Sequence, residues 1–339
     1  MEKVARRASI RLTYEGTDIS EDIAPMLVSL SCTDNASGKA DDLEVTLENR
    51  EGLWHGDWFP DQGAELVATI ECENFLQPGE TLTYPCGTYT IDEIQASYPP
   101  SRAVLRAVSS DIKEALRREH KTKAWENITL QAIAGDIADS HSLELLYDAP
   151  DVEYTRKDQR KESDLTFLAR LTEEAGFRLK VAERQIIIYS GQEYDSKDPA
   201  MEYTEQDIAS WEFRAEAHEV FSACRVSYWD PGEKIILEHT FRPRDVPESG
   251  QTLVVNERVE SRAQAEKLAM AKLREANQAE VTGTVKRLGD PRVFAGNTLS
   301  LSGLGVFSGK YFIEQARHKY TKADGYSTEV SLRRTLEDY

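Results

Sequence analysis

The sequence predicts an α+β protein in which strands dominate, with two strand-rich regions on either side of a central α/β region. Short runs of alternating apolar and polar residues, punctuated by Gly and Pro, fill residues 8–109 and return after residue 199. Between these regions, apolar residues recur at the three- and four-residue spacing of helices. A chain of 339 residues has room for two or three domains. We therefore expect domains at 1–109, 110–198 and 199–339.

Composition and charge exclude several classes of protein. Hydrophobic residues make up 40% and charged residues 30% of the chain, as in an ordinary soluble globular protein. The net charge of -19 and the pI near 4.9 argue against a specific nucleic-acid surface, because phosphate binding needs clustered Lys and Arg. Solubility explains the acidity, and an interface that selects a basic partner is the alternative.

Membrane insertion and export are not expected. No apolar run approaches the roughly 20 residues that span a bilayer. Residues 8–14 alternate like a strand and lack the apolar core of a signal peptide.

The cysteines predict a protein that folds in the cytoplasm. Cys32, Cys72, Cys86 and Cys224 show no Cys-x-x-Cys spacing and no paired His positions. They are typical of buried thiols, with a disulfide framework or a zinc site as the less favoured alternative.

The first region contains almost entirely strand and turn signals. In residues 41–48, Leu43, Val45 and Leu47 alternate with polar side chains, which predicts a strand with Glu44, Thr46 and Glu48 on a wet face. The spacing of the strands predicts an antiparallel barrel or a sandwich. The other expected strands are 8–14, 27–31, 65–70, 88–94 and 103–108.

An aromatic segment, 54–60, interrupts these strands. Trp54 and Trp58 could bind a sugar or a base, but no coherent set of polar ligands lies near them in the sequence. A plug that closes one end of a barrel is the favoured interpretation.

The midpoint of the chain carries the clearest helix. Ser163 is a suitable N-cap, Asp164 suits the positive end of the helix dipole, and Gly176 suits a left-handed position after the last turn. The face that we expect to be buried carries Leu165, Leu168, Leu171, Thr172 and Ala175.

Two more helices are expected in the central region. Thr129 can cap a helix whose apolar stripe is Leu130, Ile133, Ala134, Ile137 and Ala138. A helix over 111–123 would gather the basic residues Lys113, Arg117, Arg118, Lys121 and Lys123. This cluster is either a solvated helix face, which we favour, or a dock for an acidic partner.

The third region begins after a polar stretch, 190–199, which we interpret as a domain boundary. Strands at 223–228 and 234–240 flank a turn at Trp229–Gly232. Ser261 and Gln264 form a capping box that opens a helix reaching about Ala279. Further strands are expected at 281–285, 297–301, 310–314 and 326–332.

The search for catalytic chemistry yields no site residues. Neither the six histidines nor the pair His218 and Glu219 forms a local metal motif, and no nucleophile elbow or phosphate loop occurs. The glycines of 303–309 have the wrong spacing for a dinucleotide site and precede a strand, so we expect a loop between strands. Carboxylate neighbours such as Glu173 and Glu174 do not face each other on a helix. We therefore assign no catalytic, cofactor-binding or metal residues, with an enzyme built from distant residues as the alternative.

Four motifs together resemble a known family. They are the run from Gln159 to Gly176, the tripeptide Gly289-Asp-Pro291, the pair Ala295-Gly296, and the segment from Gly309 through His318 to Thr328. The chain, from about Ala8 to Arg334, resembles the phage late control protein D family. These are baseplate hub proteins of contractile tails, related to the N-terminal hub domain of type VI secretion spike proteins.

The resemblance implies a non-enzymatic virion protein without a cofactor. It implies a homotrimer in which two similar β-barrels per chain make a pseudo-hexameric ring, which adapts the tail tube to the spike. The implied partners are the spike, the tube or tube initiator, and the tape-measure protein, with assembly in the host bacterial cytoplasm. The alternatives are a tail-associated cell-wall hydrolase and a carbohydrate-binding module.

Overall fold

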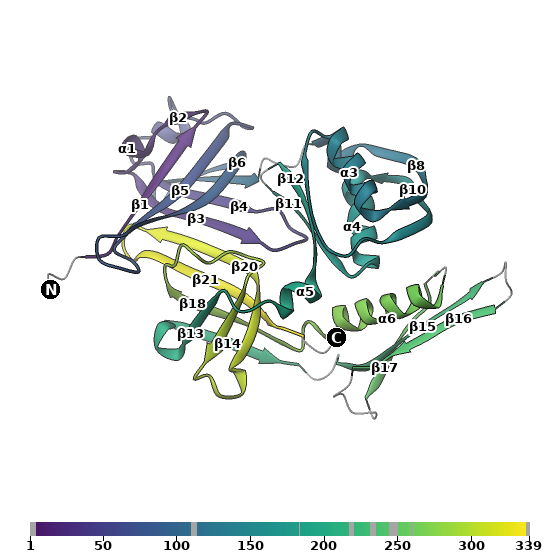
Figure 1. Cartoon of the computed structure of the whole chain (residues 1–339). Coiled ribbons are helices and arrows are strands. Elements are labelled where there is room, and N and C mark those ends of the chain that lie inside the picture. Colours follow the sequence, from purple (N-terminus) through teal and green to yellow (C-terminus); the bar gives the residue numbers. More distant parts are fainter. Residues whose placement is uncertain are drawn as a thin grey trace.

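The computed structural model describes residues 5–109, 114–182, 184–216, 220–230, 235–243, 250–257, 259 and 261–336, and Figure 1 shows the chain. Strands dominate this part of the chain, and helices concentrate in its middle. The prediction of a mainly β protein with a central α/β region is therefore confirmed.

The first region is built mostly from strands. Leu43, Val45 and Leu47 are buried, as their alternation with polar residues predicted. Thr46, expected on a wet face, is also buried. The elements are β1 (Arg7–Tyr14), β2 (Thr17–Asp18), α1 (Ser20–Ile23), β3 (Leu27–Asn35), β4 (Asp42–Glu48), η1 (Leu53–His55), β5 (Glu65–Glu73), β6 (Thr81–Ser97) and β7 (Arg102–Ser109).

The central region packs its helices against two small sheets. The α3 stripe is buried as predicted, and Thr129 accepts a hydrogen bond from the Ala132 N–H at 3.2 Å. The elements are α2 (Glu114–Arg118), β8 (His120–Thr129), α3 (Leu130–Ser140), β9 (Glu144–Asp148), β10 (Glu153–Ser163), α4 (Asp164–Glu174), β11 (Phe177–Ala182), β12 (Gln185–Ser190) and α5 (Gly191–Ser196).

The helix expected over 111–123 was wrong beyond Arg118. Lys121 and Lys123 lie on strand β8 instead, and Lys113 lies outside the described residues. The Lys123 ammonium sits 3.3 Å from the centre of the Trp125 ring. Packing of β8 against β10 overrides the weak helical pattern, so the five basic residues do not form one helix face.

The third region combines sheet strands with one long helix. Ser261 caps α6 by accepting a hydrogen bond from the Gln264 N–H at 3.1 Å, as predicted. The elements are β13 (Met201–Thr204), η2 (Glu205–Asp207), β14 (Ser210–Ala215), β15 (Phe221–Asp230), β16 (Ile235–Phe241), β17 (Gln251–Val255), α6 (Arg262–Asn277), β18 (Val281–Leu288), β19 (Thr298–Ser302), η3 (Gly305–Phe307), β20 (Gly309–Thr321) and β21 (Gly325–Arg334).

One sheet joins the first and third regions. Its 13 strands follow the path β14-β18-β21-β20-β3-β4-β7-β6-β5-β1-β2, with β13 and β19 on a branch. The joint is the antiparallel pair of β20 and β3, from Gln315↔Asn35 to Thr321↔Ser29. Figure 1 shows these purple and yellow strands side by side. Among the described strands no ladder closes either half, so the two closed barrels stay a prediction.

Each region has its own hydrophobic core. Buried side chains from Leu12 to Ala107, joined by Tyr326, form the first, and those from Leu116 to Ile188 form the second. A third core surrounds β18 to β21, and a fourth lies where α6 covers β15 and β16 (green in Figure 1). None of the described helices is long and apolar enough to cross a membrane.

Candidate functional site: polar junctions between the core regions

The motif run that begins at Gln159 builds a buried polar cluster where β10 passes into α4. The Asp164 carboxylate accepts hydrogen bonds from Lys121 at 2.6 Å, Gln159 at 2.8 Å and His141 at 2.8 Å. Ser163 accepts from the Thr166 N–H at 3.2 Å, which confirms the N-cap. Burial raises the pKa of Asp164, but the three hydrogen bonds outweigh this, so its pKa lies below the usual value.

The rest of this motif ties the exposed side of α4 to β10. Arg170 pairs with Glu162 at 2.7 Å and with Glu174 at 3.1 Å, and Lys157 pairs with Glu174 at 2.5 Å. Within the motif, Arg170 therefore binds the carboxylates of Glu162 and Glu174. These ion pairs hold the corner between β10 and α4 together.

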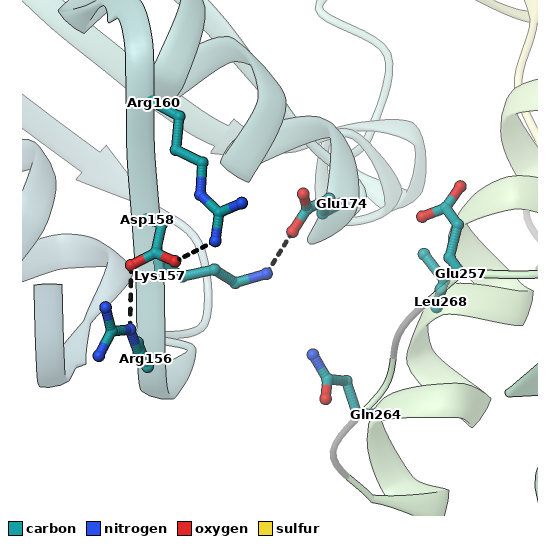
Figure 2. Close-up of a pocket in the computed structure, with 8 residues that line it drawn as sticks. All are labelled: Arg156, Lys157, Asp158, Arg160, Glu174, Glu257, Gln264 and Leu268. Carbon is teal, nitrogen blue, oxygen red and sulfur yellow. Dashed lines mark hydrogen bonds and ion pairs between the residues drawn. The ribbon is translucent and has the colours of Figure 1, made fainter. Parts of the chain in front are cut away.

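A cavity of about 610 Å³ separates this corner from the third region. Figure 2 shows Arg156, Lys157, Asp158 and Arg160 of β10 on one side, with Glu257 and the α6 residues Gln264 and Leu268 on the other. Asp158 accepts hydrogen bonds from Arg160 at 2.7 Å and Arg156 at 3.0 Å, which lower its pKa. A partly exposed carboxylate with a lowered pKa is ionised at neutral pH and is a poor general acid.

A second polar junction joins the central region to the first. The Lys180 ammonium of β11 lies 2.5 Å from an Asp34 oxygen and 3.2 Å from an Asp41 oxygen. Burial lowers the pKa of Lys180, but the two carboxylates outweigh this and raise it above its usual value. The Tyr189 hydroxyl adds a hydrogen bond to the Ala36 carbonyl at 3.1 Å.

A third junction centres on Asp195, in the stretch 190–199 that we interpreted as a plain boundary. Here a short helix, α5, buries the Asp195 side chain completely. Its Oδ2 accepts hydrogen bonds from Arg274 of α6 and from Arg333 of β21, the latter at 2.9 Å. Arg274 and Arg333 lie 79 and 138 positions from Asp195 along the chain. No local sequence pattern could therefore reveal these ion pairs.

The C-terminal motif forms the junction between the first and third regions. The His318 Nε2–H donates to the Val293 carbonyl at 3.0 Å, which leaves Nδ1 to accept from the Tyr326 hydroxyl at 2.6 Å. The ring of Tyr84, from β6, stacks on His318 with centroids 3.6 Å apart. Burial lowers the pKa of His318 to about 4, so the imidazole is neutral at pH 7.

The Gly289-Asp-Pro291 tripeptide lies against β21 at this junction, where the Asp290 N–H donates to the Thr328 hydroxyl at 3.0 Å. A Cβ on Gly289 would lie 2.0 Å from the Tyr326 ring, so only glycine fits there. Asp290 is fully buried and pairs with Arg292 at 2.7 Å and Arg287 at 3.0 Å. These ion pairs and hydrogen bonds hold its pKa below the usual value although burial raises it.

Two further expectations concern aromatic residues and metals. Trp54 is 6% exposed, belongs to the first core, and meets Trp58 edge-on at 5.7 Å. The plug of a barrel end stays a prediction. In the described part of the chain, no group of three or more His, Cys, Asp or Glu side chains is placed to hold a metal ion. His218 and Glu219 lie outside the described residues.

The residues that form these junctions were compared with known protein families. The family model described as the Alg8 N-terminal domain matches residues 100–322. The chain belongs to the Alg8 N-terminal domain family. The matched range includes the central region, α6 and the Asp290 and His318 junction, and the family description names a domain without an activity.

The resemblance to phage baseplate hub proteins is also confirmed. The chain is 31% identical over 173 residues to a protein of Escherichia phage P2 named "Probable baseplate hub protein", a match over 50% of this chain and 42% of that protein. The match thus spans less than half of the phage protein's length.

Solved structures confirm the fold over nearly the whole chain. The tail protein of Neisseria meningitidis MC58 has a TM-score of 0.71 and 14% identity, covering 98% of this chain and 99% of that one. An Escherichia coli component of the type VI secretion system gives a TM-score of 0.56 and 12% identity, covering 98% of this chain and 78% of that one. At these identities the comparisons establish the fold only.

Proposed function

We propose that the chain is a structural baseplate hub protein of a contractile phage tail or tailocin. The observation that carries the proposal is the 31% identity over 173 residues to the phage P2 protein. The full-length fold similarity to a bacterial tail protein supports the same role. The protein would then belong to the tail baseplate of a virion and be assembled in the bacterial cytoplasm.

The proposed unit is a homotrimer with a pseudo-hexameric ring. The regions 1–109 and 199–339 would each curl into a barrel-like unit, with 110–198 packed beside them. The sheet that runs through both outer regions supports this arrangement, as does the stacking of Tyr84 on His318 at their joint. Three chains would supply six such units and match a hexameric tube to a trimeric spike.

The proposed role is not enzymatic. The buried charged residues Asp164, Asp195 and Asp290 are each bound by neighbouring cations, which supports a role in holding regions together. The proposed partners are the spike, the tail tube or its initiator, and the tape-measure protein, without cofactors, specific nucleic-acid binding or membrane insertion.

The decisive experiment measures the mass of the purified protein by light scattering after size-exclusion chromatography. A homotrimer of the 38.3 kDa chain is expected. A monodisperse monomer at high concentration would contradict the ring. Peptidoglycan zymography tests the hydrolase alternative, and a response of Trp54 or Trp58 fluorescence to glycans tests the carbohydrate-binding alternative.

A further inference from the structure

Two cysteines from strands that are not neighbours meet inside the first region. The Sγ atoms of Cys32, on β3, and Cys86, on β6, lie 2.9 Å apart. Strands β4 and β7 lie between β3 and β6 in the sheet, so no backbone ladder joins these two strands. The thiol contact therefore crosses the inner side of the curled sheet.

A β-bulge explains why Cys86 reaches this position. Strand β5 pairs Ala68 with Gly87 and Thr69 with Pro85, which leaves Cys86 as the extra residue of β6. A bulge redirects the side chain of its extra residue. The Cys86 carbonyl is held by the Tyr89 hydroxyl, which donates to it at 2.6 Å.

The two thiols differ in their access to solvent. Cys86 is half-buried and lines a cavity of about 340 Å³ together with Tyr84 and Lys180. Cys32 is 1% exposed, and burial together with its hydrogen bond to Cys86 raises the pKa of its thiol well above the usual value. A small reagent can therefore reach Cys86 first, and Cys32 is placed to react second.

We propose that Cys32 and Cys86 are a redox modification site, which a low-molecular-weight disulfide such as oxidised glutathione converts into an intramolecular disulfide. The Cys86 thiolate attacks one sulfur of the reagent, breaks its S–S bond and releases one thiol, which gains the proton that Cys86 lost. Cys32 then gives up its proton and attacks the Cys86 sulfur, releasing the second thiol. Two protein thiols are oxidised, and one reagent disulfide is reduced to two thiols.

The geometry requires little movement and gives the bond a structural effect. The Sγ atoms need to approach by less than about 1 Å to reach the ~2.05 Å of a disulfide. The bond would link β3 directly to β6 and close a 54-residue loop. Because Cys32 pairs with His318 of β20, it would also fix the joint between the outer regions. The site does not depend on the proposed hub function.

The test treats the folded, reduced full-length protein with oxidised glutathione and counts thiols. We expect the loss of two thiols. A peptide map under non-reducing conditions should show the Cys32 peptide linked to the Cys86 peptide. The melting temperature should rise by roughly 5–10 °C and return after reduction, because a cross-link over a loop of this length stabilises the folded state. Four thiols in the folded, treated protein, or a persistent glutathione adduct on Cys86 alone, would overturn the proposal.

Matched variants locate the reaction. Cys86→Ser, at the half-buried position, should retain the fold by circular dichroism and lose both the linked peptide and the temperature shift. Cys224→Ser, in a separate core around α6, should retain both. Cys32→Ala provides a second test, in which Cys86 should accumulate the glutathione adduct. A linked peptide that survives in Cys86→Ser, or a shift that is absent in Cys224→Ser, would contradict the assignment.

Discussion

Two buried aspartates, Asp164 and Asp195, show how differently local and long-range sequence information determines this structure. Asp164 stands at the start of α4 and is bound by Lys121, Gln159 and His141, all within the central region. Asp195 binds Arg274 and Arg333 from two elements of the third region. Asp164 therefore stabilises the central region alone, whereas Asp195 joins the central region to the third region. The motif with a visible sequence pattern is thus the one with the more local role.

The largest expected effect comes from the core of the central region, which α4 helps to form. Leu168 is fully buried in the core of the central region, so Leu168→Asp places an unpaired carboxylate among apolar side chains. We expect a loss of more than about 4 kcal/mol and failure to obtain soluble folded protein. Expression yield and circular dichroism measure this. Ala169→Asp, on the exposed face of the same helix, is the control. A cooperative melt near that of the wild type for Leu168→Asp would show that the buried face is assigned wrongly.

The second prediction compares the aspartates directly. Asp195→Asn removes the carboxylate charge that two buried guanidinium groups share, which should cost about 3–5 kcal/mol. Asp164→Asn should cost only about 1–3 kcal/mol, because the Lys121 side chain is 33% exposed and can be solvated. Urea unfolding measures both free energies. Asp198→Asn, at an exposed position, controls for the loss of one charge. Equal losses of unfolding free energy in Asp195→Asn and Asp164→Asn would show that the two aspartates contribute equally to stability.

The pH dependence of stability tests the junction at His318. Its pKa falls from 6.5 to about 4 on folding because of burial, so between these values the unfolded chain binds a proton that the folded chain does not. The stability associated with this residue is therefore complete above pH 6.5 and is lost as the pH falls towards 4, by up to about 3 kcal/mol. His318→Gln should flatten the stability curve between pH 6.5 and 4. The exposed His120→Gln should leave that slope unchanged, and an unaltered slope in His318→Gln would contradict the buried neutral imidazole.

The sequence was sufficient where one element carries the whole signal. The caps at Thr129, Ser163 and Ser261, and the left-handed Gly176, were all predicted and are all present. Each depends on residues within one turn of a helix, where the pattern and the physical cause coincide.

The sequence was insufficient where two distant elements share a contact. The pairing of β20 with β3 and the burial of Asp195 depend on side chains brought together only by the fold. Residues 120–123, the start of β8, were predicted as helix but form strand, because pairing with β10 decides their conformation. The stretch 190–199 has the polar composition of a linker, and nothing in its sequence shows that Asp195 is buried.

The smallest expected effect compares a partly exposed ion pair with the fully buried pairs of Asp195. Lys157 and Glu174 lie 2.5 Å apart beside the cavity of Figure 2, with side chains 19% and 28% exposed. Because water screens such a pair, Lys157→Met should cost less than about 1 kcal/mol, and the loss should shrink further in 1 M salt. Arg156→Met, on the same strand, removes the ion pairs of a more exposed cation with Glu126 and Asp158 and should cost no more than Lys157→Met. Urea unfolding at two salt concentrations gives the measurement. A loss as large as that of Asp195→Asn would mean that burial does not govern the strength of these polar contacts, and that the corner between β10 and α4 holds the molecule together as firmly as the Asp195 junction.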